Sequence, residues 1–274
     1  MDLLQQTQYL IKNIGLRPDK LKGQNFCIDE KVLQAMVKAA RAGKNDTVLE
    51  VGAGFGFLTT ELAKIAKEVV AVEIEPALVR ILRNLQAVYK NVEVVQGDIL
   101  KIQNLKLKAQ NYKIVANLPY SITSAFLRKF LTTENKPSSI TLLLQREVAQ
   151  RICAQPGEMS LLAVSVQLYG EPKIISTVKP ASFWPRPSVN SAILQINDLQ
   201  PFPFQKQVSE LKFWQVVRAG FCAKRKTLEN NLANSFHLSK EDVQKSLINS
   251  GLNPLVRAQE LSLDDWLKLT TSFN

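Results

Sequence analysis

Residues 47–56 have the sequence Thr-Val-Leu-Glu-Val-Gly-Ala-Gly-Phe-Gly. The first five form a short, mainly apolar run typical of a buried strand, and three glycines then turn the chain into a helical pattern that begins at Phe57. Further strand patterns occur at 69–73 and 92–96, with a helical pattern at 76–89 between them. This alternation predicts right-handed crossovers and a parallel, doubly wound α/β sheet.

The same rhythm continues through two more predicted strands, 112–116 and 139–144, with a helix at 121–131 between them. Two β-rich runs, 163–178 and 191–196, then break the alternation. We expect these runs to form a hairpin-like pair that closes the sheet in the antiparallel sense.

Segment 198–203 contains two prolines and is interpreted as a linker. Beyond it the pattern is helical only, with helix-start signals at Ser239 and Ser262, each followed three residues later by Asp. We therefore predict a cofactor-binding catalytic domain at 1–199 and a small all-helical domain at 200–274.

The chain carries 35 Lys and Arg against 24 Asp and Glu, a net charge of +11. A protein this basic often binds a polyanion, because each neutralised phosphate releases a counterion; a solvated basic surface is the alternative. The three cysteines are far apart and there is a single histidine, His237, so we expect no disulfide framework, no zinc or other metal site and no His-based triad. We see no signal peptide and no apolar run that could span a membrane, so we expect a cytoplasmic protein.

Three features at successive strand ends predict a bound adenosine. The loop glycines Gly52 and Gly54 allow close backbone approach to a ligand, although a glycine turn alone is weak evidence. Glu73 ends the second strand, where a carboxylate binds ribose hydroxyls. Asp98 follows the third strand, where a carboxylate accepts a hydrogen bond from an adenine amino group. Each acid singly is more often a solvated loop end, but the three together favour an adenosine-bearing cofactor.

The sequence Asn117-Leu118-Pro119-Tyr120 follows the fourth strand and indicates the reaction. The lone pair of an adenine amino group is delocalised into the ring. Two acceptors, the Asn117 side-chain oxygen and a backbone carbonyl near Leu118, would hold the amino hydrogens and aim the lone pair at a methyl donor. Pro119 stiffens the loop, and Tyr120 is placed to stack on an extruded base. A proline turn with a packed tyrosine is the alternative.

Several motifs in the same order resemble the KsgA/RsmA family of ribosomal RNA adenine N6-dimethyltransferases. They are Gly23-Gln-Asn-Phe26, the glycine loop, Asn117–Tyr120, Phe183-Trp-Pro-Arg-Pro187 with Val189-Asn-Ser-Ala192, and Phe221-Cys-Ala-Lys-Arg-Lys-Thr-Leu-Glu-Asn-Asn-Leu232. The resemblance covers almost the whole chain. It implies a Rossmann-like methyltransferase sheet and S-adenosylmethionine as co-substrate. It also implies that Asn25 and residue 27 line the cofactor site with Gly52, Glu73, Asp98 and Asn117; here residue 27 is Cys27, where the family usually has Leu.

The resemblance further implies that two adjacent adenosines, in a hairpin near the 3′ end of small-subunit rRNA, each receive two methyls, and that the enzyme takes part in subunit maturation. We expect a monomer that binds the immature small subunit. The basic residues of the C-terminal part are candidates for phosphate contacts along apparent helices, whereas Phe213, Trp214 and Phe221 are interpreted mainly as core. These candidates are Lys212, Arg218, Lys224, Arg225 and Lys226.

Two alternatives stay open. An Erm-type enzyme of large-subunit rRNA shares the cofactor and Asn-Leu-Pro-Tyr-like motifs, although the segment 224–231 argues against it. A mainly non-catalytic ribosome assembly factor is compatible with the same sequence. DNA adenine methylases and nicotinamide oxidoreductases are disfavoured by Leu118 and by the GxGxG spacing, respectively.

Overall fold

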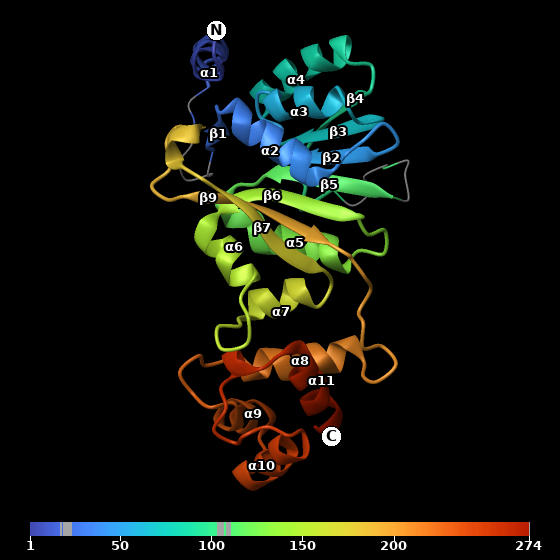
Figure 1. Cartoon of the computed structure of the whole chain (residues 1–274), viewed down its shortest axis with the longest axis vertical. Helices are drawn as coiled ribbons and strands as arrows, with labels where there is room; N and C mark the ends of the chain where they lie inside the picture. Colours follow the sequence, from blue (N-terminus) through green and yellow to red (C-terminus); the bar gives the residue numbers. More distant parts are fainter. Residues whose placement is uncertain (17, 19–23, 103–106, 108–110, 274) are drawn as a thin grey trace. The chain divides into compact units, whose positions relative to one another are not determined.

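The computed structural model describes residues 1–16, 18, 24–102, 107 and 111–273, and only the backbone of Tyr120. Its largest feature is a seven-stranded sheet in the order β4-β3-β2-β5-β6-β9-β7 (Figure 1). The strands are β2 Thr47–Val51, β3 Glu68–Glu73, β4 Val92–Gln96, β5 Tyr112–Asn117, β6 Ser139–Gln145, β7 Glu171–Val178 and β9 Ser191–Asn197. Strands β2 to β6 are parallel, and β9 pairs antiparallel with both β6 and β7, as the α/β prediction requires.

The order of the strands places a switch point beside β2. The chain leaves β2 toward β3 and β4 on one side and returns to β5 on the other. In an open parallel sheet such a point leaves a crevice at the carboxyl ends of the strands, where ligands bind. Val51 is in register with both Val72 and Ala116, so the residues after these strands reach the same edge.

Helices connect and cover the strands. In the first part of the chain they are α1 Leu3–Ile14, α2 Glu30–Ala40, α3 Phe57–Ala63, α4 Pro76–Val88, α5 Thr123–Thr132 and α6 Arg146–Ile152, with short 3-10 turns η1 Tyr120–Ile122 and η2 Pro180–Ser182. Asp29 caps α2 by accepting from Lys31 N, and Pro76 occupies the first turn of α4, where its missing N–H has no cost. Helix α2 packs against β5, β6 and β9, and α4 packs against β3 and β4.

One predicted strand run was partly wrong. The β-rich run 163–178 begins in a helix, α7 Leu161–Gln167, and becomes a strand only from Glu171. Ser160 caps this helix by accepting from Ala163 N, and Ala163, Val164 and Val166 are fully buried. Packing of that apolar face outweighs the low helix propensity of the valines.

The chain packs as two compact units, residues 1–149 with 171–199, and residues 150–170 with 200–274. The sequence analysis placed 150–170 in the first domain, but by contact these residues belong to the second unit. Backbone bonds join them to it, from Gln200 N to Tyr169 O and from Met159 N to Gln259 O. The extent of each unit as an independently folding domain stays a prediction.

Beyond the sheet the chain is helical, as predicted. The elements are α8 Glu210–Gly220, α9 Leu228–Phe236, α10 Lys240–Asn249, η3 Ala258–Glu260 and α11 Leu263–Ser272. Ser239 and Ser262 cap α10 and α11, which confirms both predicted helix starts. Trp266 and Phe213 are buried in the core of this unit. A search of the described residues finds no helix with the length and hydropathy needed to cross a membrane.

Candidate functional site

A cavity of about 450 Å³ lies at the carboxyl ends of the parallel strands. This volume falls within the usual range of small-molecule sites. The structure brings together residues that the sequence placed at separate strand ends. Those that line the cavity include Asn25, Gly52, Gly54, Glu73, Asp98, Asn117, Leu118 and Pro119.

Glu73, at the end of β3, is 6% exposed and its carboxylate is already held by the backbone. Its Oε2 accepts from Gly54 N at 2.9 Å, and its Oε1 accepts from Ile74 N at 2.9 Å and Glu75 N at 3.0 Å. Burial raises the pKa of Glu73, and the three N–H groups oppose that rise. A carboxylate has about four acceptor sites, so capacity remains for a ligand hydroxyl.

Asp98 lies two residues beyond the end of β4, in a tight turn. Its Oδ1 accepts from Leu100 N at 2.9 Å, whereas its Oδ2 is 4.0 Å from the ammonium of Lys101, an exposed side chain. The turn thus uses one carboxylate oxygen to order itself. The second oxygen keeps capacity to accept from an amino group in the cavity.

Asn117 ends β5, and its amide is oriented by the segment before β1. The Asn117 Nδ2 donates to the carbonyl of Asn25 at 3.2 Å. This bond orients the amide, whose Oδ1 can only accept hydrogen bonds. The following residue, Leu118, is buried and its N–H donates to Leu143 O at 3.3 Å, which ties the loop to β6.

The glycine loop packs closely against other parts of the protein. Gly52 has φ +74°, and a Cβ there would lie 3.2 Å from the carbonyl oxygen of Asn117. Gly56 has φ +81°, and its Cβ would lie 2.1 Å from Leu85 Cδ1. The positive φ values and these close contacts favour glycine at both positions.

Two distant motifs meet in a small second sheet that the sequence analysis did not predict. Strand β1, Phe26–Cys27, pairs antiparallel with β8, Phe183–Trp184. This pairing fixes the segment that carries Asn25 against the Phe-Trp-Pro-Arg-Pro motif. The Cys27 side chain is buried and lines a separate hollow, and burial raises its pKa to about 11.

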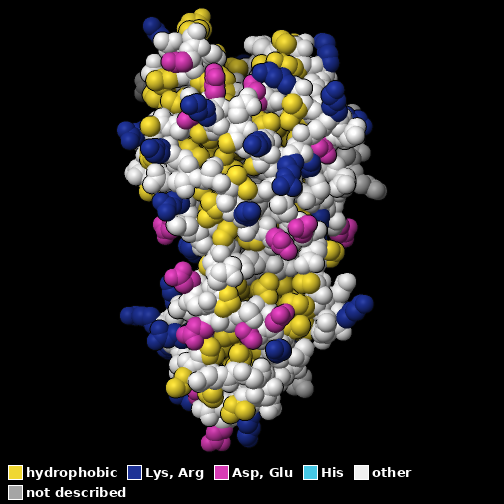
Figure 2. Space-filling model, viewed as in Figure 1, with side chains coloured by type: hydrophobic (Ala, Val, Ile, Leu, Met, Phe, Trp, Pro, Cys, Tyr) yellow, Lys and Arg dark blue, Asp and Glu magenta, His cyan; other side chains and the backbone are white. Residues whose placement is uncertain are grey.

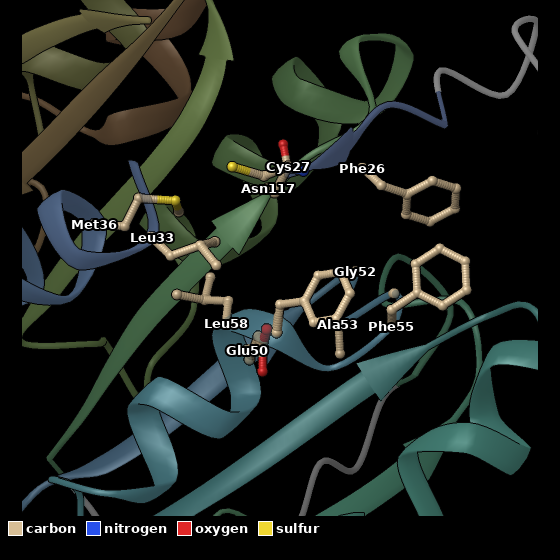
Figure 3. Close-up of a pocket in the computed structure, with 12 residues that line it drawn as sticks. Phe26, Cys27, Leu33, Met36, Glu50, Gly52, Ala53, Phe55, Leu58 and Asn117 are labelled. Atoms are coloured by element: carbon tan, nitrogen blue, oxygen red, sulfur yellow. The ribbon is translucent and has the colours of Figure 1, made fainter. Parts of the chain in front are cut away.

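That hollow, about 40 Å³ in volume, adjoins the cavity and shares Gly52 and Asn117 with it. In Figure 3 the side chains of Met36, Leu33 and Leu58 lie on one side of it and the rings of Phe26 and Phe55 on the other. Its walls also include one carboxyl group, that of Glu50.

Glu50 is one residue near the site that the sequence analysis missed. It is 1% exposed, and its Oε2 has no hydrogen-bond partner among the described residues. Burial, with the negative charge of Glu73 adding to it, raises the pKa of Glu50 to about 8. The available signal was a carboxylate inside a mainly apolar strand that leads into the glycine turn.

The basic candidates of the C-terminal part differ in exposure and in secondary structure. Lys212 and Arg218 lie on α8, half-buried and exposed respectively. Lys224, Arg225 and Lys226 are all exposed but occupy the turn between α8 and α9, which corrects their expected helical placement. On the face that Figure 2 shows, Lys and Arg side chains are scattered and form no continuous patch.

The aromatic candidates of this unit separate by burial. Phe213 is fully buried, as expected for core. Trp214 is half-buried and its Nε1 donates to the Tyr169 hydroxyl at 3.2 Å. Phe221 is half-buried and its ring centroid lies 5.5 Å from that of Trp266. These rings therefore pack within the protein.

Two features predicted from the sequence lie outside the part of the chain that the structure describes. The Tyr120 side chain, proposed for base stacking, and Gly23 lie outside the described residues. Within the described part of the chain no group of three or more His, Cys, Asp or Glu side chains is arranged to hold a metal ion. His237 follows α9 as its C-cap, in the left-handed conformation, and is exposed.

Comparison with solved structures supports this fold. The crystal structure of the 23S rRNA methyltransferase ErmE superposes with a TM-score of 0.72 at 26% identity, covering 90% of this chain and 99% of that one. A dimethyladenosine transferase from Plasmodium falciparum gives a TM-score of 0.75 at 25% identity, with 89% and 95% covered.

Sequence relatives are closer. A ribosomal RNA small subunit methyltransferase A from Dehalococcoides mccartyi is 41% identical over 99% of this chain and 94% of its own length. One from Clostridium botulinum is 38% identical over 96% and 97%. The family model for ribosomal RNA adenine dimethylase matches residues 18–274. The chain therefore belongs to the ribosomal RNA adenine dimethylase family.

Proposed function

We propose that this protein transfers methyl groups to the N6 atoms of two adjacent adenosines in a hairpin near the 3′ end of small-subunit rRNA. Family membership makes the chain an rRNA adenine dimethyltransferase, with S-adenosylmethionine as the methyl donor. The observation that carries the site assignment is the Asn117 amide. Its nitrogen is held by Asn25, and the same residue lines the cavity formed by the glycine loop, Glu73 and Asp98.

In this proposal the cavity holds the methyl donor. Glu73 accepts from the ribose hydroxyls with the capacity that its backbone bonds leave, and Asp98 accepts from the adenine amino group through Oδ2. Gly52 and Gly54 provide the close backbone approach. Asn25 lines the cavity and Cys27 lines the adjoining hollow. We propose that the methionine end of the donor lies beside this segment, with the backbone of Cys27 as its contact.

The reaction requires little acid–base catalysis by the protein. When bound, S-adenosylmethionine supplies an electrophilic methyl group. The Asn117 Oδ1 and a backbone carbonyl at Leu118 hold the two amino hydrogens, so the nitrogen lone pair points at the methyl carbon. The new N–C bond forms as the S–C bond breaks, and the alkylated amine then loses a proton to solvent. A second donor repeats the step.

The small-subunit assignment is supported by the degree of similarity. Relatives named for the small subunit are 37–42% identical, whereas the 23S rRNA methyltransferase ErmE is 26% identical. Lys212, Arg218 and the turn at 224–226 are proposed to contact phosphates. We further propose that the protein acts as a cytoplasmic monomer on the immature subunit, where it also serves as an assembly factor.

The direct test uses isotopically labelled S-adenosylmethionine with unmethylated small subunits and, separately, with large subunits. We expect label in small subunits only, at two adjacent adenosines when the modified bases are mapped. The Asn117→Ala variant is the control for background labelling. Label in large subunits alone would support the Erm-type alternative, and binding without label would support a purely non-catalytic assembly role.

A further inference from the structure

The ammonium of Lys129 holds the loop that forms one wall of the cavity. Lys129 lies on α5 and is half-buried. Its Nζ donates to the carbonyls of Ile99 at 2.8 Å, Leu100 at 3.4 Å and Ile102 at 2.5 Å. An ammonium has three N–H donors, so these backbone carbonyls can use its full capacity.

The same loop is held from its other polar side by Asp98. The Asp98 Oδ1 accepts from Leu100 N, and its backbone carbonyl accepts from Lys101 N at 2.9 Å and Ile102 N at 3.0 Å. The N–H groups of the loop thus turn toward Asp98 while its carbonyls turn toward Lys129. Because the two sets of bonds share one short turn, a change in either shifts the other.

This turn also faces the cavity and is tightly packed. Ile99 and Leu100 line the cavity together with Asp98. Ile102 packs closely against Gly97: a Cβ on Gly97 would lie 3.0 Å from the Cδ1 of Ile102. The position of the Asp98 carboxylate relative to the cavity therefore depends on where the carbonyls after it are held.

We propose that Lys129 is a positioning residue for adenine recognition: by holding three carbonyls of the 99–102 loop, it aims the Asp98 carboxylate at the exocyclic amino group of the methyl donor's adenine. This inference rests on the proposed role of Asp98. Lys129 acts through the loop and does not itself touch the ligand. A neutral side chain at 129 would leave the three carbonyls without their charge-assisted donors, and the loop would relax.

The test compares two ligands that differ in the Watson–Crick edge of the base. S-adenosylhomocysteine carries the exocyclic amino group, and S-inosylhomocysteine carries an oxygen in its place and a hydrogen on N1. Calorimetry gives the ratio of their dissociation constants. We expect wild type to prefer the adenine ligand, Lys129→Met to lower that preference by about fivefold or more, and Lys129→Arg to restore most of it.

Lys136→Met is the matched control. Lys136 follows the same helix and its Nζ donates to the carbonyl of Leu131, away from the cavity lining. Its loss should leave the preference unchanged. Asp98→Asn should abolish the preference, and adding Lys129→Met to it should lower the preference no further, since both act on one contact.

The possible outcomes distinguish the adenine-binding role of Asp98 from the positioning role of Lys129. If Asp98→Asn keeps the preference, the adenine role of Asp98 in the proposed function fails. If Asp98→Asn loses the preference while a folded Lys129→Met keeps it, the positioning role of Lys129 is refuted. Equal weakening of both ligands in Lys129→Met also refutes it, because a general structural role would act on both. Lys129→Gln replaces Lys129→Met should the latter not fold.

Discussion

Replacing Glu50 by Gln should change how stability depends on pH. Glu50 is 1% exposed and its pKa is raised to about 8 from the usual value of 4.5. Between these two values the unfolded chain releases the proton, whereas the folded protein keeps it. The folded state binds more protons there, so the free energy of unfolding falls as pH rises and levels off above pH 8.

The magnitude follows from that difference in pKa. Each pKa unit by which the folded value exceeds the unfolded value lowers the free energy of unfolding by about 1.4 kcal/mol, at a pH where the group is ionised in both states. For Glu50 the loss amounts to a few kcal/mol between acid and alkaline conditions. This is a large share of the roughly 5–15 kcal/mol by which domains are stable. Glu50→Gln, which cannot ionise, should not show this loss.

Urea unfolding from about pH 5 to about pH 9 measures how the free energy of unfolding depends on pH. The informative quantity is the wild-type free energy minus that of Glu50→Gln, because Glu73 titrates in both proteins. We expect this difference to fall with pH and then flatten. Glu93→Gln, at an exposed strand position, is the control and should follow wild type. Parallel curves for wild type and Glu50→Gln would refute the buried, protonated state of Glu50.

Three further predictions concern the site, the RNA surface and the helical unit. Asn117→Ala should lower the single-turnover rate much more than RNA affinity; a rate within about threefold of wild type, about 0.65 kcal/mol, would contradict its hold on the amine. Replacing the three basic residues of the 224–226 turn by Gln should flatten the salt dependence of subunit binding, and an unchanged slope would move the RNA surface elsewhere. Gly220→Ala places a methyl 2.4 Å from a ring carbon of a buried tryptophan, so stability should drop by about 1–3 kcal/mol in urea unfolding, and an unchanged midpoint would show that the core can repack.

The strands from 47 to 145 were predictable because each is a local pattern. Short apolar runs alternate with helical spacing, and the glycine turn marks where the first strand ends. The relation between strand ends also follows from chirality, since right-handed crossovers bring parallel strands to one edge. Glu73, Asp98 and Asn117 were therefore placed together from sequence alone.

The missed features depend on tertiary packing. The helix at Leu161–Gln167 contains valines that favour strands, and only its buried face decides the outcome. The pairing of Phe26 with Trp184 joins segments far apart in the chain, for which no local signal exists. Glu50 lies inside a strand pattern, so its place beside the hollow becomes visible only when α2 and α3 pack over it.

The position of β9 in the sheet has a consequence for folding during synthesis. Strand β7 is made first, yet among the described strands it pairs with β9 alone, which lies between it and β6. As the chain emerges from N- to C-terminus, β6 stays an open edge and β7 has nothing to pair with until residues 191–197 arrive. The Phe183–Trp184 segment that closes the wall beside Asn25 is released in the same interval. A nascent chain shorter than this contains the parallel strands and the residues that line the cavity, but it lacks the strand that pairs with the segment beside Asn25.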